Sequence, residues 1–259
     1  MAETFENYLR AEGLAPGTVR VYQSIRRRMA QQAPEAFLRK NLRYVPHGTA
    51  TTYRAAVRHV IRWRGGDPDE VKLPRGRRRK RKLRTPLEPE SLAAYYVAVR
   101  ELCDPCRTLL SLLPRTGLRV SEACQLRPGD VQIRRGVRGL RIRGKGSHER
   151  FVPLDDQAQA TIDAYLADHA ITDGYLFRGR RGHITPSRVR QAARQVGASI
   201  DAKVTPHVLR HTFATSVHRS TGDIRIVQAL LGHASITTTL LYITPDEASM
   251  LEAINLSDL

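Results

Sequence analysis

The sequence predicts a mainly helical protein of the α+β class, with a small all-helical N-terminal domain and a larger, mostly helical domain that contains one small antiparallel sheet. Apolar residues recur at helical spacing along most of the 259 residues. One segment instead has two short apolar runs around a turn-rich stretch, which is typical of a β-hairpin. A strongly basic segment divides the chain, so we expect a helical domain over 1–72, a basic linker over 73–86 and a second domain over 87–259.

Three helical patterns make up the N-terminal domain. A short helix is expected around Phe5 to Leu9. A second begins at Thr18, a residue type that caps helix N-termini, and its buried face holds Val19, Tyr22, Ile25 and Met29. A third ends at a Gly-Gly pair, and its buried face holds Tyr53, Val57, Val60 and Ile61. This third helix also carries a basic stripe that favours nucleic-acid contact over an ordinary solvated face, because it lies beside the basic linker: Arg54, Arg58 and Arg62.

The linker is the most basic part of the chain. Seven of the eight residues from Arg75 to Lys82 are Lys or Arg. Like charges repel, so this run is predicted to stay extended. We expect it to lie along DNA phosphates as an arm, and the plainer alternative is a generic nucleic-acid patch. The residues assigned to DNA binding here are Arg77, Arg78, Arg79, Lys80, Arg81 and Lys82.

The second domain opens at Leu87 with helices in SLAAYYVAVRELC and CRTLLSLLPRTG. In GLRIRGKGSHERFVPL the apolar runs LRI and RFVPL flank GKGSHE, which predicts the hairpin. Five further helical segments follow: AQATIDAYLADHA, TPSRVRQAARQVGA, TPHVLRHTFATSVHRS, DIRIVQALLG and SITTTLLY. The chain is therefore expected to be mostly helical around one small sheet.

Composition narrows the class of function. The chain has 43 Lys and Arg against 25 Asp and Glu, a net charge of +18, which attracts polyanions such as nucleic acid. The chain contains no run of about 18 apolar residues, so no membrane span is predicted. The start of the sequence, MAETFENYLR, lacks the apolar region of a signal peptide, so we expect a cytoplasmic protein. Cys103 and Cys106 form a C-x-x-C without a second ligand pair, so we interpret them as small residues near a helix start.

The stretch HVLRHTF raises the question of a metal site. It places His207 and His211 four residues apart on one helical face, as zinc proteases do. It lacks the glutamate that serves such proteases as general base, and Arg210 would repel a dication. A zinc site is therefore disfavoured. This stretch alone does not exclude the alternative that the two histidines are packed polar residues.

Further polar residues stand among apolar ones at Arg119, Glu122, Lys145, His233 and Tyr242. Each has an ordinary interpretation by itself, such as a surface cation, a turn residue, a helix cap or a core aromatic. Together with Arg210 they supply what attack on a phosphodiester requires. Two arginines can hold the phosphate oxygens and offset transition-state charge, a tyrosine can be the nucleophile, and a lysine can protonate the leaving hydroxyl.

TGLRVSE, GKGSHERFVPL, HVLRHTFAT and LGHASITTTLLY stand in an order and approximate spacing that resemble the tyrosine recombinases, the phage-integrase and Xer-like family. The resemblance covers about residues 85 to 245 and implies a role for each matching position. Arg119 and Arg210 would clamp the scissile phosphate, Lys145 would protonate the leaving 5′-oxygen, and Tyr242 would attack to form a 3′-phosphotyrosyl link. His207 would exchange the tyrosine's proton, His233 would bond the phosphate, Glu122 would support the site, and His211 would pack.

The resemblance implies a site-specific DNA recombinase that integrates, excises or resolves DNA and needs no metal, ATP or other cofactor. Its N-terminal domain would bind a short core site, and the two domains would form a C-shaped clamp on double-stranded DNA. The pattern starts almost at Met1, so we expect no arm-binding domain. A short amphipathic helix in ITPDEASMLEAINLSDL would dock on a neighbouring protomer and build a homotetramer in the synaptic complex. The alternatives are a type IB topoisomerase and a catalytically silent DNA-binding protein.

Overall fold

The computed structural model describes residues 4–42, 47–70, 85–144, 149–180 and 182–232. Contacts divide the chain into two compact units, Met1–Lys82 and Leu83–Leu259. Most of the predicted basic linker, including Arg77 to Lys82, lies outside the described residues, as does the predicted tail helix.

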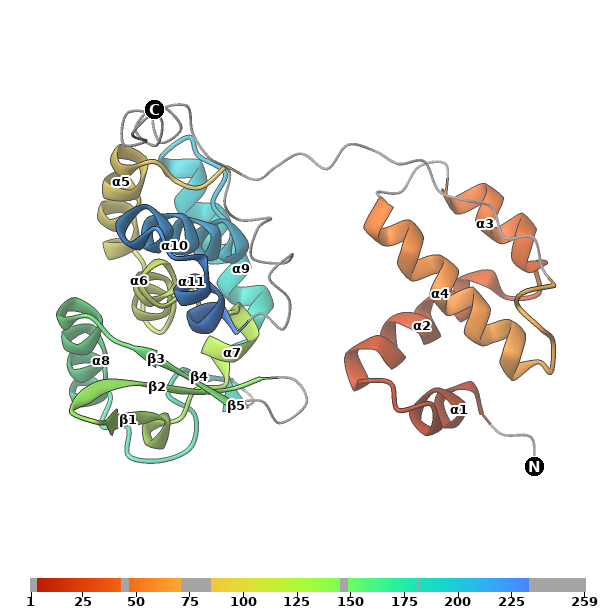
Figure 1. Ribbon diagram of the computed structural model, residues 1–259, viewed down its shortest axis with the longest axis horizontal. Helices are drawn as coiled ribbons and strands as arrows, with labels where there is room; N and C mark the ends of the chain where they lie inside the picture. The colour runs from red at the N-terminus through yellow and green to blue at the C-terminus, as the bar shows by residue number, and fades with distance from the viewer. Residues whose placement is uncertain (1–3, 43–46, 71–84, 145–148, 181, 233–259) are drawn as a thin grey trace, which may run out of the picture. The chain divides into compact units, whose positions relative to one another are not determined.

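The first unit holds four helices among its described residues: α1 (Phe5–Ala11), α2 (Pro16–Met29), α3 (Pro34–Leu42) and α4 (His47–Trp63). In this unit α2 packs on α4, and α1 and α3 pack against this pair (Figure 1). The predicted core positions of α2 and α4 are all buried, so those two helical faces are confirmed. The predicted start of α2 at Thr18 is wrong by two residues, because Pro16, with its fixed φ, takes the first helical position.

Aromatic rings contribute to the core of the first unit. The Phe5 and Trp63 rings meet edge to face at 5.4 Å between centroids, and the Arg26 guanidinium lies 4.6 Å from the Trp63 centroid. The unpredicted helix α3 closes this core with its buried residues Phe37, Leu38 and Leu42. On α4, Arg54 and Arg58 are half-buried and Arg62 is exposed, and Arg58 pairs with Asp69.

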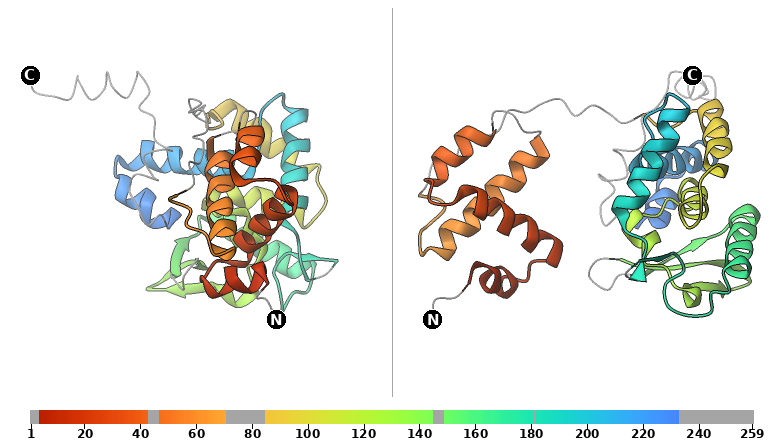
Figure 2. Two further views of the ribbon diagram at one scale, coloured as in Figure 1. Left: turned by 90° about the vertical axis from the view of Figure 1, so that its right-hand side faces the viewer. Right: turned by 180° about the vertical axis from the view of Figure 1, so that it is seen from behind.

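The second unit is built around α6 (Cys106–Thr116), which makes its most extensive contacts with four other helices. These are α5 (Pro89–Arg100), α8 (Asp156–Asp168), α9 (Pro186–Ser199) and α10 (Pro206–Thr221). Figure 2 shows α9 and α5 beside α6 when the second unit is seen from behind. The Leu side chains of α6 are almost wholly buried, and the buried Tyr95 hydroxyl donates a 2.8 Å hydrogen bond to the Leu110 carbonyl.

A three-stranded antiparallel sheet lies at one end of the second unit, in the order β1 (Val131–Arg134), β2 (Val137–Arg143) and β3 (Glu149–Pro153) (Figure 1). The predicted hairpin is confirmed as β2 and β3, with Ile142 opposite Arg150. Strand β1 was not predicted, nor was the short pair β4 (Arg178–Gly179) and β5 (Gly182–His183). The fold class is confirmed as mainly helical with a small antiparallel sheet.

Candidate active site

Arg210 lies in the first turns of α10. The helix is fixed by Pro206 at its first position and by the Thr205 hydroxyl, which accepts a hydrogen bond from the Val208 N–H at 3.2 Å. Arg210 is only 3% exposed. Its Nη1 donates to the Gly117 carbonyl and its Nη2 donates to the Leu231 carbonyl at 2.8 Å. A buried guanidinium needs such acceptors, and these two fix its orientation.

Gly117 allows α6 to end close to α10. It caps α6 in the left-handed conformation with φ of +60°. A Cβ atom there would lie 2.3 Å from a ring carbon of Phe213 on α10, so no larger residue fits without movement. The carbonyl that accepts from Arg210 thus stands two residues before Arg119, and this link brings the two predicted clamp arginines into one region of the fold.

Arg119 is held by the helix that follows it, α7 (Val120–Cys124), of which it is the N-cap. Its backbone N–H donates to Glu122 Oε2 at 2.9 Å, and its Nη1 donates to Glu122 Oε1 at 2.9 Å. The Arg119 side chain is 44% exposed and that of Glu122 only 10%. The carboxylate therefore orients a guanidinium that reaches solvent, which is the geometry expected of a group that receives an anion.

Glu122 has a second arginine partner that was not predicted. Arg150 of β3 donates from Nη1 to Oε1 at 3.1 Å and from Nη2 to Oε2 at 2.7 Å. Burial opposes ionisation of Glu122, but the hydrogen bonds and charge of Arg150, together with the Arg119 bonds, lower the pKa of the carboxyl from 4.5 to about 2. Glu122 is thus an anion at neutral pH. In the sequence, its partner Arg150 is recognisable only as a charged residue within an apolar strand.

The end of α11 (Ile224–Leu231) meets two arginines. The last four carbonyls of a helix lack partners within it, and here Arg150 Nε donates to the Leu230 carbonyl at 2.9 Å while Arg210 donates to that of Leu231. Cations at a helix C-terminus are also favoured by the helix dipole. Gly232 caps this end with φ of +63°, and a Cβ atom there would lie 2.8 Å from Arg150 Cδ.

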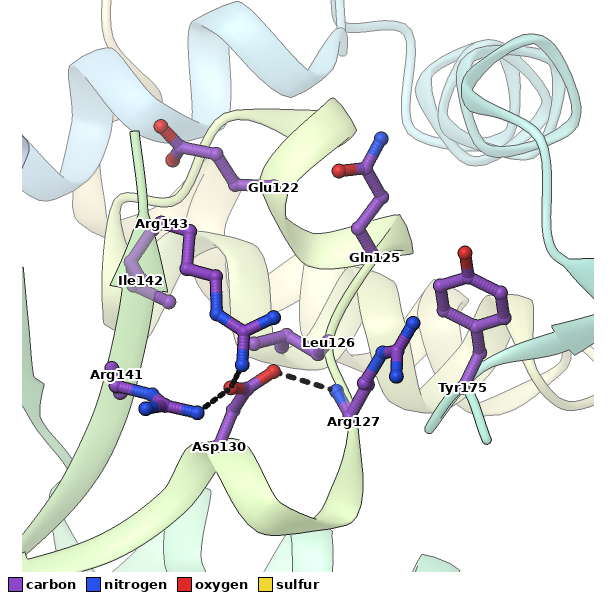
Figure 3. Close-up of a pocket in the computed structure, with 9 residues that line it drawn as sticks. All are labelled: Glu122, Gln125, Leu126, Arg127, Asp130, Arg141, Ile142, Arg143 and Tyr175. Carbon is purple, nitrogen blue, oxygen red and sulfur yellow. Dashed lines mark hydrogen bonds and ion pairs between the residues drawn. The ribbon is translucent and has the colours of Figure 1, made fainter. Parts of the chain in front are cut away.

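A small cavity of about 120 Å³ lies beside Glu122 (Figure 3). Asp130 on its floor accepts from the Arg127 backbone N–H at 3.0 Å and from the side chains of Arg141 and Arg143 at 3.3 and 3.4 Å. The Arg127 guanidinium lies over the Tyr175 ring, 5.2 Å from its centroid. Two arginine side chains and the backbone N–H of Arg127 therefore contact one buried carboxylate next to the predicted clamp, and sequence reasoning did not find this cluster.

The remaining predicted site residues are partly beyond the described structure. His207 is half-buried on α10, and His211, one turn later, is buried. Lys145 belongs to the segment between β2 and β3, and His233 directly follows Gly232. Lys145, His233 and Tyr242 lie outside the described residues. Among the residues that are described, no group of three His, Cys, Asp or Glu side chains is placed to hold a metal ion, and no helix has the length and hydropathy to cross a membrane.

Comparison with known proteins gives the class of this protein. The model of the phage integrase family matches residues 87–249. Tyrosine recombinase XerA of Thermococcus kodakarensis is 32% identical over 252 residues, which is 93% of this chain and 89% of that protein. Tyrosine recombinase XerD of Caulobacter vibrioides is 36% identical over 215 residues, covering 75% of this chain and 70% of that protein.

Comparison with solved structures agrees with this class. A crystal structure of XerA recombinase is 26% identical with a TM-score of 0.59, covering 97% of this chain and 95% of that one. A crystal structure of XerH site-specific recombinase bound to palindromic difH substrate, a post-cleavage complex, is 21% identical with a TM-score of 0.72. The match covers 96% of this chain and 82% of that one and shows the same fold. The chain belongs to the phage integrase family. It is a tyrosine-type site-specific recombinase, an enzyme that cleaves and rejoins DNA.

Proposed function

We propose that Arg119 and Arg210 clamp the scissile phosphate of a short DNA site. The observation that carries this assignment is the hydrogen bond from Arg210 to the Gly117 carbonyl. Gly117 stands only two residues before Arg119, so this bond links the two arginines. Arg210 is fixed by main-chain carbonyls and Arg119 by Glu122. Guanidinium groups held in advance can stabilise the charge of a pentavalent phosphorus without reorganising during the reaction.

In this proposal the Tyr242 hydroxyl attacks phosphorus, and His207 takes up its proton. The bond from phosphorus to the 5′-oxygen breaks, and Lys145 gives that oxygen a proton, leaving a 3′-phosphotyrosyl link and a free 5′-hydroxyl. His233 donates a hydrogen bond to the phosphate. A 5′-hydroxyl of another strand then reverses the step and releases Tyr242, so one phosphoester replaces another and no ATP is consumed.

A nicked suicide substrate tests the nucleophile. The Tyr242→Phe variant should keep specific DNA binding and lose the covalent adduct, because phenylalanine keeps the ring but has no hydroxyl. Tyr96→Phe is the matched control, since Tyr96 is a half-buried tyrosine of the same unit that packs against Arg115, and it should cleave normally. A normal adduct yield with Tyr242→Phe would identify another nucleophile. Absence of any adduct from the wild type would favour a catalytically silent DNA-binding protein.

The clamp is tested at Arg119, whose exposed side chain can be removed with little loss of packing. Arg119→Ala should slow cleavage by several orders of magnitude, since a lost transition-state donor costs about 3–4 kcal/mol. Wild-type cleavage should be unaffected by EDTA. Activity that is lost in chelator and restored by zinc would instead support the metal interpretation of HVLRHTF.

Binding of the duplex is assigned to both units. The basic stripe of α4 and the segment from Arg77 to Lys82 would contact phosphates, and the two units together would clamp the DNA. A lambda integrase dimer bound to a core site, 18% identical with a TM-score of 0.69, has the same fold over 92% of this chain and 74% of its own. Supercoil relaxation on DNA without a specific site would instead favour a topoisomerase.

The same proposal includes a tetramer on two DNA sites, held by the segment from Pro245 to the C-terminus docking on the next protomer. Its apolar residues Ala248, Leu251 and Ile254 recur at helical spacing. Deletion of residues 247–259 should leave binding to one site nearly intact and remove the tetramer on DNA. Light scattering with and without target DNA measures this. A truncated protein that still forms tetramers and recombines would show that the tail packs on its own unit.

A further inference from the structure

The cavity drawn in Figure 3 is lined by three arginines that share one carboxylate. Arg141 and Arg143 each donate from Nη2 to the same oxygen, Asp130 Oδ1, at 3.3 and 3.4 Å. The other oxygen, Oδ2, accepts from the backbone N–H of Arg127, so the Arg127 guanidinium adds its charge without bonding to Asp130. One buried carboxylate therefore cannot balance the three guanidinium charges around the cavity.

Most N–H donors of these arginines are not used within the part of the chain that the structure describes. A guanidinium has five N–H donors, and Arg141 and Arg143 each use one of them on Asp130. Arg141 Nε is buried and has no hydrogen-bond partner among the described residues. The Arg127 guanidinium lies over the Tyr175 ring, a contact that uses its face and not its N–H groups. The wall of the cavity thus offers donors to an anion.

The second carboxylate at this cavity, Glu122, is already matched by cations. Its Oε1 accepts from Arg119 and Arg150, and its Oε2 accepts from Arg150 and from the Arg119 backbone N–H. A different arginine of β2 shows what a matched surface pair looks like, since Arg138 donates from both Nη atoms to the two oxygens of Asp163. The arginines of the cavity have no such pairing, so the excess positive charge is concentrated there.

We infer that Arg127, Arg141 and Arg143 form a second phosphate subsite, which holds a backbone phosphodiester of the DNA near the scissile one. The forked donors of arginine match the oxygens of a phosphate, and DNA is the polyanion on which this enzyme acts. One water needs about 10–15 Å³ of such space, so a cavity of about 120 Å³ can hold a phosphate group. The nearness to the scissile phosphate rests on the proposed function, because Glu122 lines the cavity and also holds Arg119 of the proposed clamp.

The test is a methylphosphonate scan of a duplex that carries a target site recovered by covalent trapping. Each duplex has one phosphate replaced by a neutral methylphosphonate, and binding is measured by fluorescence anisotropy. The wild type should bind about 10-fold more weakly when the phosphate of the subsite is neutral, as expected for a lost hydrogen bond between charged groups. The double variant Arg127→Gln/Arg143→Gln should bind the unmodified duplex about 10-fold more weakly and should not respond to the neutral linkage at that one position. Its slope of log K against log salt should be lower by about 0.9, the value for one phosphate contact.

The matched control is Arg138→Gln, which removes an arginine of the same strand and should keep the wild-type response at every position. A double variant that also keeps the wild-type response at every position would refute the subsite and leave these arginines as partners of Asp130 alone. Arg141 still bonds to Asp130 in the double variant, so the buried carboxylate keeps a partner. Should that variant not fold, Arg143→Gln carries the comparison, because the Arg143 side chain is 56% exposed.

A separate variant distinguishes this inference from the proposed clamp. Arg119→Gln should reduce the response at the scissile phosphate alone and leave the response at the subsite phosphate unchanged. If Arg119→Gln responds to a neutral scissile phosphate as the wild type does, the proposed clamp fails, whereas the subsite is still judged by the double variant. If the position that the double variant no longer senses is far from the scissile phosphate, the arginines bind DNA but the subsite inferred here is overturned.

Discussion

Substitution of Glu122 by glutamine measures how strongly the two arginines depend on its charge. The amide keeps the size of the carboxyl but resembles its neutral form. The pKa of Glu122 falls from 4.5 to about 2 in the folded protein, and about 1.4 kcal/mol for each pH unit gives about 3 kcal/mol. We expect Glu122→Gln to lower the free energy of unfolding at pH 7 by about this amount. For a unit of this size the unfolding midpoint should fall by roughly 6–12 °C.

The loss should depend on pH in a defined direction. Because the folded-state pKa lies below the ordinary value, ionised Glu122 stabilises the folded protein fully above pH 4.5, and this contribution disappears as the pH falls toward 2. The difference between wild type and Glu122→Gln should therefore be constant from pH 7 to about 5. It should shrink to roughly 1.4 kcal/mol at pH 3, one pH unit above the folded-state pKa.

Thermal unfolding followed by circular dichroism gives this difference at each pH. The single tryptophan, Trp63, packs on Phe5 in the first unit, so its fluorescence reports that unit alone. Its transition should be the same in wild type and variant, which serves as an internal control. A difference below 1 kcal/mol at pH 7, or one that does not change down to pH 3, would show that the charge of Glu122 does not stabilise this site.

Three further predictions concern packing, a buried hydrogen bond and the basic linker. Gly117→Ala should destabilise the protein by roughly 1–3 kcal/mol in urea unfolding, because its Cβ would lie 2.3 Å from Phe213, whereas Gly129→Ala, with open space around it, should not. Tyr95→Phe should cost about 1 kcal/mol by the same measurement, since the Leu110 carbonyl loses its donor. Neutral residues in place of Arg77 to Lys82 should flatten the slope of log K against log salt by about 0.9 for each lost phosphate contact, and an unchanged slope would mean that the segment is a solvated linker.

Helix faces were predictable because their apolar residues recur with a period, and the hairpin because two apolar runs flank a turn-rich stretch. Val19, Tyr22, Ile25 and Met29 recur at helical spacing and are buried on α2. Helix α3 was missed because its buried residues, Phe37, Leu38 and Leu42, span barely one turn and a half of such a pattern. Strand β1 was missed for a similar reason, because it has only four residues, of which the first two are half-buried and the last two exposed.

The candidate site was only partly predictable, since a motif gives residue types and not their partners. Arg119 and Glu122, three residues apart, are joined as the start of a helix permits. Arg150 could not be found in this way, because its partners Glu122 and Leu230 are 28 and 80 residues away in sequence. Nor does HVLRHTF reveal that Arg210 is buried against two carbonyls.

The bond from Arg210 to the Leu231 carbonyl joins the proposed phosphate clamp to the end of α11, the helix that precedes Tyr242 in the sequence. On the proposed assignment, the guanidinium that holds the scissile phosphate also holds the carbonyl of Leu231, and Tyr242 follows on the same chain eleven residues later. Coupling between two such sites is reciprocal. DNA that fills the clamp should stabilise the end of α11. A substitution that loosens this helix end should weaken DNA binding by the same factor by which bound DNA stabilises the helix end, although it touches no phosphate.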